Sequence, residues 1–194
     1  VDPVVADGLA NALDVLRGEG ASIHSVSMPP YNEVIDSWVP ICAAEAVLGH
    51  AETYPTQASE YGPVTGGLLE TGVNLSGTDY ARATIVRRNF CGQLARLFDE
   101  VDLLAAPAMV VPTPRNDNLD ELLGAPGALE RLIRYTAPFD HSGSPTISLP
   151  CGFTGEGLPL GFQLIGRHLD EGLLLRAGHA FERATVWNAS HPDM

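Results

Sequence analysis

Asp140, His141 and Ser142 stand side by side and include the side-chain types that nucleophilic catalysis most often combines. A catalytic triad needs the hydroxyl, the imidazole and the carboxylate in consecutive hydrogen-bond contact. Adjacent side chains leave the backbone in diverging directions, so this tripeptide does not form a triad by itself. Its pattern is typical of a polar loop that leads into a strand.

The overlapping run Ser142-Gly143-Ser144-Pro145 has two interpretations. Glycine lets a backbone approach another group closely, and proline favours extended geometry in the residue before it. A serine nucleophile needs an activating base, and the sequence places no lysine or histidine to act on either serine. The run is therefore either a structural turn or one wall of a ligand pocket.

Lysine is absent from the whole sequence. A Walker A loop, a protein kinase and a pyridoxal-phosphate enzyme each need a lysine, so none of these sites lies in this chain. The remaining histidines show no H-x-H, H-x-x-H or H-E-x-x-H spacing, which predicts no local zinc site and leaves open only a metal site assembled from distant positions. We expect no cofactor. These histidines are His24, His50, His168, His179 and His191.

The chain carries a formal net charge of −13, because 24 acidic residues face 11 arginines. Nucleic-acid binding needs a basic surface, and anionic membranes attract basic segments. The sequence shows no apolar run of the ~20 residues that span a bilayer and no basic-then-apolar leader. We therefore expect no nucleic-acid partner, no membrane partner and a cytoplasmic location.

Length and periodicity predict one domain over residues 1–194, of the α/β class, with helices packed on a mixed β-sheet. Helices are expected over residues 3–18, 33–53 with a kink or division at Pro40, 68–71, 79–98, 128–134 and 170–185. Strands are expected over residues 21–26, 101–106, 146–149 and 160–165, the last two forming an antiparallel hairpin around the turn at 154–157.

The stretch from Tyr135 to Arg167, YTAPFDHSGSPTISLPCGFTGEGLPLGFQLIGR, resembles the C-terminal part of the amidase signature family. Further matching offsets are Tyr80-x-x-Ala83-x-x-x-Arg87, Phe98-x-x-x-Asp102-Leu103-Leu104-x-x-Pro107 and Leu173-Leu174-x-x-Ala177. Members of this family are serine hydrolases that cleave amide C–N bonds with a Ser–cis-Ser–Lys triad.

The resemblance implies that the triad lies outside this chain. In the family, the lysine and the Gly/Ser-rich loop that carries both serines precede the region matched here. Residues 1–194 would then be the C-terminal half of an amidase, with no catalytic residue of their own. The N-terminal half, from the same gene or a partner chain, would supply the nucleophile and the oxyanion hole.

The resemblance also implies a substrate-binding segment. Family members that use glutamine carry charged anchors whose approximate equivalents here are Ile133 and the run 66–68, which favours a neutral aryl or alkyl amide over free glutamine. The expected substrate-binding residues are Tyr135, Thr136, Phe139, Asp140, His141, Ser142 and Gly143.

Two other functions remain open at this point. The chain could be a non-catalytic binding or scaffold protein derived from the amidase fold. It could also be an unrelated hydrolase that uses a metal or a Ser/His pair. A small-molecule amide and a homo-oligomer complete the expected partners.

Overall fold

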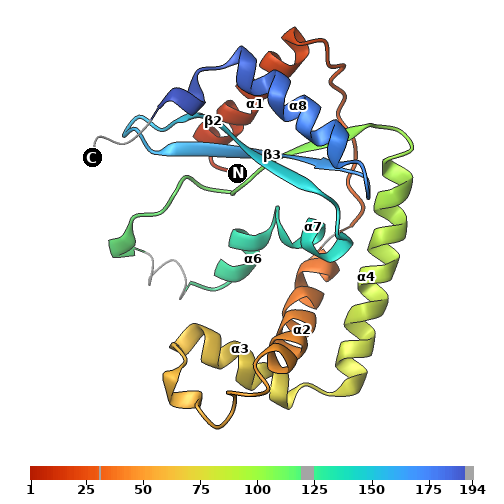
Figure 1. Ribbon diagram of the computed structural model, residues 1–194, viewed down its shortest axis with the longest axis vertical. Helices are drawn as coiled ribbons and strands as arrows, with labels where there is room; N and C mark the ends of the chain where they lie inside the picture. Colours follow the sequence, from red (N-terminus) through yellow and green to blue (C-terminus); the bar gives the residue numbers. More distant parts are fainter. Residues whose placement is uncertain (31, 119–124, 191–194) are drawn as a thin grey trace. The chain divides into compact units, whose positions relative to one another are not determined.

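The computed structural model describes residues 1–30, 32–118 and 125–190 (Figure 1). The described chain divides into two compact units. The first unit comprises Val1–Met28 and Ala95–Met194, and the second comprises Pro29–Leu94. The single-domain organisation expected from the chain length stays a prediction.

The first unit is built on a three-stranded sheet. Strands β1 (Leu103–Pro107), β2 (Thr146–Phe153) and β3 (Pro159–Gly166) lie in the order β1-β3-β2, and both neighbouring pairs are antiparallel. The predicted hairpin of β2 and β3 is confirmed, with Ile147 opposite Leu164. A mixed sheet also needs a parallel pair, and the strands of the described residues form none.

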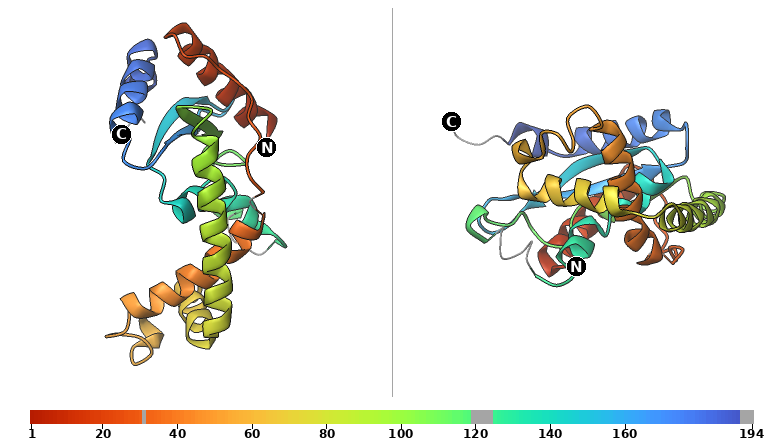
Figure 2. Two further views of the ribbon diagram at one scale, coloured as in Figure 1. Left: turned by 90° about the vertical axis from the view of Figure 1, so that its right-hand side faces the viewer. Right: turned by 90° about the horizontal axis from the view of Figure 1, so that it is seen from below.

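Two helices cover one face of this sheet (Figures 1 and 2). They are α1 (Pro3–Gly18) and α8 (Glu171–Ala184), which also contact each other. The core between them and the sheet contains Val5, Ala12, Leu16, Leu149, Cys151, Leu160, Phe162, Leu164, Leu174 and Phe181. Side chains alternate along a strand, so the residues between Phe162, Leu164 and their neighbours point to the opposite face.

The start of α1 follows from its sequence. The side chain of Asp2 accepts a hydrogen bond of 2.9 Å from the amide of Val4. Pro3 is the first helical residue, where the N–H that proline lacks would have no acceptor within the helix. The strand expected over residues 21–26 is wrong, because this segment has no regular secondary structure and pairs with none of the described strands. Ile23 packs against the core cluster instead, which accounts for the apolar pattern.

The second unit is helical. Its helices are α2 (Asn32–Gly49), α3 (Pro63–Asn74) and most of α4 (Gly77–Leu97), with a short 3-10 turn at Ala58–Glu60. Helix α2 continues through Pro40, so the helix is not divided there. Helix α3 is longer than the four residues expected, because Pro63 starts it well before Leu68.

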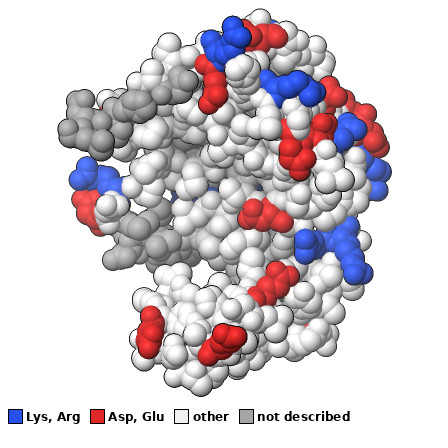
Figure 3. Space-filling view, in the orientation of Figure 1, with Lys and Arg blue, Asp and Glu red and all other residues white. Residues whose placement is uncertain are grey.

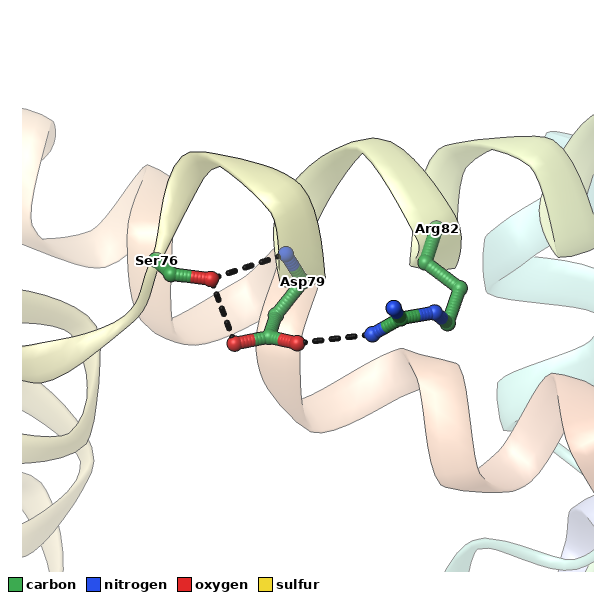
Figure 4. A network of polar contacts seen from close by, with 3 residues as sticks. All are labelled: Ser76, Asp79 and Arg82. Atoms are coloured by element: carbon green, nitrogen blue, oxygen red, sulfur yellow. Dashed lines mark hydrogen bonds and ion pairs between the residues drawn. The ribbon is translucent and has the colours of Figure 1, made fainter.

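Helix α4 begins with a polar network of three side chains (Figure 4). The hydroxyl of Ser76 accepts a hydrogen bond of 3.1 Å from the amide of Asp79 and donates one of 2.6 Å to the carboxylate of the same residue. Arg82 pairs with the same carboxylate at 2.8 Å. The Ser76 hydrogen bond, with help from Arg82, lowers the pKa of Asp79. Ser76 thereby provides an acceptor for one of the first N–H groups of the helix, which have no acceptor within the helix.

The remaining short elements lie in the first unit. They are the 3-10 turns Asn116–Asn118 and Trp187–Ala189 and the helices α6 (Ala128–Ile133) and α7 (Ala137–Ser142). Helices α6 and α7 lie on the side of the sheet away from α1 and α8 (Figure 1). Within the described residues, no helix is both long and apolar enough to cross a membrane.

Candidate substrate-binding segment

The residues expected to bind substrate lie in one segment, from Tyr135 to Gly143, around helix α7. The polar loop expected at Asp140-His141-Ser142 is wrong, because these residues form the last turn of α7. Pro138 in the first turn and Gly143 directly after the last are the usual marks of a helix start and end, so the sequence carried a signal for it.

Gly143 ends the helix in the left-handed conformation, with φ of 70°. Its amide donates to the carbonyls of Phe139 at 2.9 Å and of Asp140 at 3.3 Å. A residue with a Cβ pays a steric penalty in this conformation, and glycine does not. Gly143 thereby turns the chain sharply from α7 toward β2.

The segment is embedded on one side and open on the other. Phe139, His141 and Ser142 are buried, with exposed fractions of 7%, 4% and 5%. Asp140 and Gly143 are exposed. Tyr135 and Thr136 are half-buried, and these two side chains begin the segment. A mixture of aromatic area with a few polar groups is typical of small-molecule sites.

The two serines after Phe139 bond to each other and to the backbone. The hydroxyl of Ser142 lies 3.1 Å from the carbonyl oxygen of Phe139 and 2.9 Å from the hydroxyl of Ser144. The amide of Ser144 also donates to the Ser142 hydroxyl, at 3.3 Å. These hydrogen bonds hold the run in a turn, and whether it also forms a pocket wall stays a prediction.

Strand β3 and the residues after it hold both ends of the segment. At the start, Gln163 donates from its side-chain amide to the carbonyl oxygen of Tyr135 at 2.5 Å. At the end, a ring nitrogen of His168 lies 2.7 Å from the carbonyl oxygen of Ser142. The amide of Gly166 then donates to Pro145 at 2.9 Å. The stretch from Tyr135 to Arg167 that resembles the family includes Gln163, but the contact between Gln163 and Tyr135 depends on the folded chain.

An open cavity of about 370 Å³ is lined by residues outside this segment. Its lining residues are Val1, Asp2, Val110, Val111, Arg131 and Arg134. Arg134 directly precedes Tyr135, and its guanidinium pairs with Glu130 at 3.1 Å. The cavity therefore contains charge of both signs close to the start of the segment.

Charged residues elsewhere are spread over the surface. On the face drawn in Figure 3, acidic and basic side chains are interspersed between uncharged areas. Among the residues that the structure describes, His, Cys, Asp and Glu form no group of three suited to a metal ion. His191 lies outside the described residues. The buried thiol of Cys151 has a raised pKa, because burial disfavours its charged form.

The fold of this chain is shared with a solved hydrolase. The solved structure of 6-aminohexanoate cyclic dimer hydrolase superposes with a TM-score of 0.84 and 23% sequence identity, over 100% of this chain and 44% of that one. At this identity the likeness shows the fold alone. The predicted α/β fold with a helix-packed sheet is confirmed.

The chain belongs to the amidase family, whose model matches residues 1–175. It is 41% identical to AmiD of Mycobacterium tuberculosis over 152 residues, which are 78% of this chain and 32% of AmiD. It is 34% identical to an amidase of Pseudomonas putida over 199 aligned residues, covering 100% of this chain and 42% of the relative. The chain thus spans less than half of the relatives it matches. Family membership also excludes the alternative of an unrelated hydrolase.

Proposed function

We propose that this chain is the C-terminal, substrate-facing part of an amidase that hydrolyses the C–N bond of a neutral amide. The observation that carries this function is the family match over residues 1–175. In the reaction, a serine oxygen attacks the amide carbonyl carbon, the C–N bond breaks, and the amine leaves with a proton. Water then hydrolyses the acyl-enzyme and releases the acid.

The nucleophile comes from residues outside this chain. The sequence contains no lysine to activate a serine. The hydroxyls of Ser142 and Ser144 are engaged with each other, and His168 approaches the backbone oxygen of Ser142 and not its hydroxyl. A serine nucleophile requires a base within hydrogen-bond reach of its hydroxyl. We therefore assign no catalytic residue to residues 1–194.

The segment from Tyr135 to Gly143 lines the acyl side of the substrate pocket. Tyr135 and Phe139 supply aromatic area for an aryl or alkyl group, while Thr136, Asp140 and His141 supply polar contacts. The exposed carboxylate of Asp140 repels a substrate that carries its own carboxylate. This charge favours a neutral amide over an amino-acid amide with a free acid.

The proposal requires a second part of the enzyme, either earlier in the same polypeptide or in a partner chain. That part supplies the lysine, the two serines and the backbone amides that bind the developing oxyanion. The non-catalytic alternative keeps the same fold but lacks this chemistry. The two differ in whether the full-length protein turns over any amide.

The test compares the full-length gene product with residues 1–194 alone. Both are incubated with a panel of neutral aryl and alkyl amides and with glutamine, and release of amine or ammonia is measured. We expect the full-length protein to hydrolyse at least one neutral amide in preference to glutamine, and residues 1–194 to hydrolyse none. A folded full-length protein that is inert toward the whole panel would instead favour the scaffold alternative.

A further inference from the structure

Gln163 occupies a buried position at the centre of the first unit's sheet. Only 3% of the residue is exposed, and it lies on β3 between Phe162 and Leu164, whose side chains enter the core under α1 and α8. Because side chains alternate along a strand, Gln163 points to the other face. The segment that starts at Tyr135 lies on that face.

The side-chain nitrogen of Gln163 connects two stretches of backbone. It lies 3.1 Å from the carbonyl oxygen of Pro107, at the end of β1, and 2.5 Å from that of Tyr135. A primary amide carries two N–H groups on one nitrogen, so it can donate to both carbonyls together. The two acceptors are separated from Gln163 by 56 and 28 residues along the chain.

Glutamate and methionine, which are similar in size to glutamine, do not fit this arrangement. Glutamate is acceptor-only when ionised and would place negative charge against two carbonyl oxygens. Methionine fills the volume but leaves both carbonyls without their donor. Position 163 therefore requires a side chain with two N–H donors. This requirement explains why a polar residue stands in a strand that is otherwise almost wholly apolar.

We propose that Gln163 is a positioning residue for the substrate-binding segment. It fixes the backbone of Tyr135, and thereby the direction in which the chain enters α7, the helix that carries Phe139. At the far end of the segment, His168 contacts the carbonyl of Ser142, and the amide of Gly166 donates to the carbonyl of Pro145. Together with Gln163 at the near end, these contacts form a clamp that β3 and the residues after it place on the segment. The role in catalysis rests on the proposed function, whereas the clamp itself does not.

Three variants of the full-length protein separate this role from mere stabilisation. Gln163→Met keeps the volume and removes both donors. Gln163→Glu keeps the shape, and its carboxyl regains one donor when it is protonated. Gln57→Met is the matched control, because Gln57 is exposed and lies in the second unit.

The first readout is amide hydrogen exchange, which needs no substrate. The amides of Phe139 and Asp140 donate to the carbonyl of Thr136 and report on the first turn of α7. We expect about tenfold or faster exchange at these amides in Gln163→Met, since a carbonyl that loses its partner loosens the turn. Unchanged exchange in both Gln163 variants would overturn the clamp, whatever the protein's activity.

The second readout is kinetics. Misplacement of a substrate group by about 1 Å can cost on the order of 100-fold in rate, so we expect kcat/KM to fall by about this factor in Gln163→Met. A buried carboxyl facing two carbonyl oxygens has a raised pKa. The ratio of Gln163→Glu to wild-type activity should therefore rise at least threefold between about pH 8 and about pH 5.

The outcomes distinguish this role from the proposed function. If wild-type protein hydrolyses no amide, the proposed function fails while the exchange data still decide the clamp. If the wild type is active and the Gln163→Glu ratio stays flat with pH, Gln163 is only structural and the positioning role is wrong. Gln57→Met should match the wild type in both readouts.

Discussion

The hydroxyl oxygens of Ser142 and Ser144 lie 2.9 Å apart across Gly143. The Ser142 hydroxyl can donate its one proton either to the Ser144 hydroxyl or to the Phe139 carbonyl, 3.1 Å away, while it accepts from the amide of Ser144. This pattern satisfies the hydroxyl completely and closes the turn after α7. A hydroxyl held in this way stabilises a backbone turn and is not poised for attack on a substrate.

Replacement of either serine should therefore affect stability more than chemistry. We expect Ser144→Ala to lower the free energy of unfolding by about 1 kcal/mol, and Ser142→Ala by about 1–3 kcal/mol because it leaves the Ser144 amide without its acceptor. Denaturant unfolding of the full-length protein measures both, with the exposed Ser25→Ala as control. Loss of about 10⁴-fold in kcat at unchanged stability would identify a nucleophile and contradict the assignment.

Phe139 should influence which amide is preferred. Phe139→Leu keeps an apolar side chain but removes the aromatic face, so we expect kcat/KM for an aryl amide to fall about 10-fold more than for a small alkyl amide. The control is Phe153→Leu, because Phe153 packs on Trp187 at the far end of β2. Equal losses on both substrates, in step with lost stability, would make Phe139 structural.

Gly72 permits the close packing of α3 on α2. A Cβ added at Gly72 would overlap the backbone carbonyl of Ala43 and lie 2.7 Å from a methyl group of Val47. We expect Gly72→Ala to destabilise the protein by about 1–3 kcal/mol, the typical cost of adding a group to a well-packed core.

The matched control for Gly72 is Gly67→Ala on the same helix, where an added Cβ meets nothing within 4 Å. Alanine favours helix over glycine, so this variant should gain about 0.5–1 kcal/mol. Thermal unfolding compares the two variants. Equal melting temperatures would show that α2 and α3 do not pack as the structure has them.

The contribution of Cys151 to the free energy of unfolding should fall at alkaline pH. Burial raises the pKa of its thiol above the usual value, so its contribution to stability is complete below the unfolded pKa of about 8.5 and declines as pH rises through the folded value. The difference in unfolding free energy between wild type and Cys151→Ala should be constant up to about pH 8 and shrink above about pH 9. A difference that grows with pH would contradict the burial of this thiol.

The sequence predicted those elements whose signals are local. The hairpin of β2 and β3 follows from two apolar runs around Thr154-Gly155-Glu156-Gly157, and α1 follows from Asp2 and Pro3. The strand expected over residues 21–26 is absent because pairing depends on a distant partner, and the part of the chain that the structure describes offers this segment none. Local apolar character could not distinguish strand pairing from packing on the core.

The family resemblance predicts which residues form the candidate segment, but it does not predict their geometry. Six residues are too few for periodicity to predict α7, although Pro138 and Gly143 mark its ends. The clamp from Gln163 to Tyr135 joins residues 28 positions apart, so no local pattern contains it. The resemblance also located the catalytic serine and lysine outside the chain, and this placement stays a prediction.

The location of the nucleophile is the central claim, and covalent labelling with a fluorophosphonate tests it most directly. The probe phosphonylates the activated serine of a serine hydrolase, and mass spectrometry of the full-length protein identifies the modified residue. We predict one labelled serine outside residues 1–194, with loss of amide hydrolysis in proportion to labelling. Stoichiometric labelling of Ser142, Ser144 or another serine within residues 1–194, with parallel loss of activity, would contradict the account.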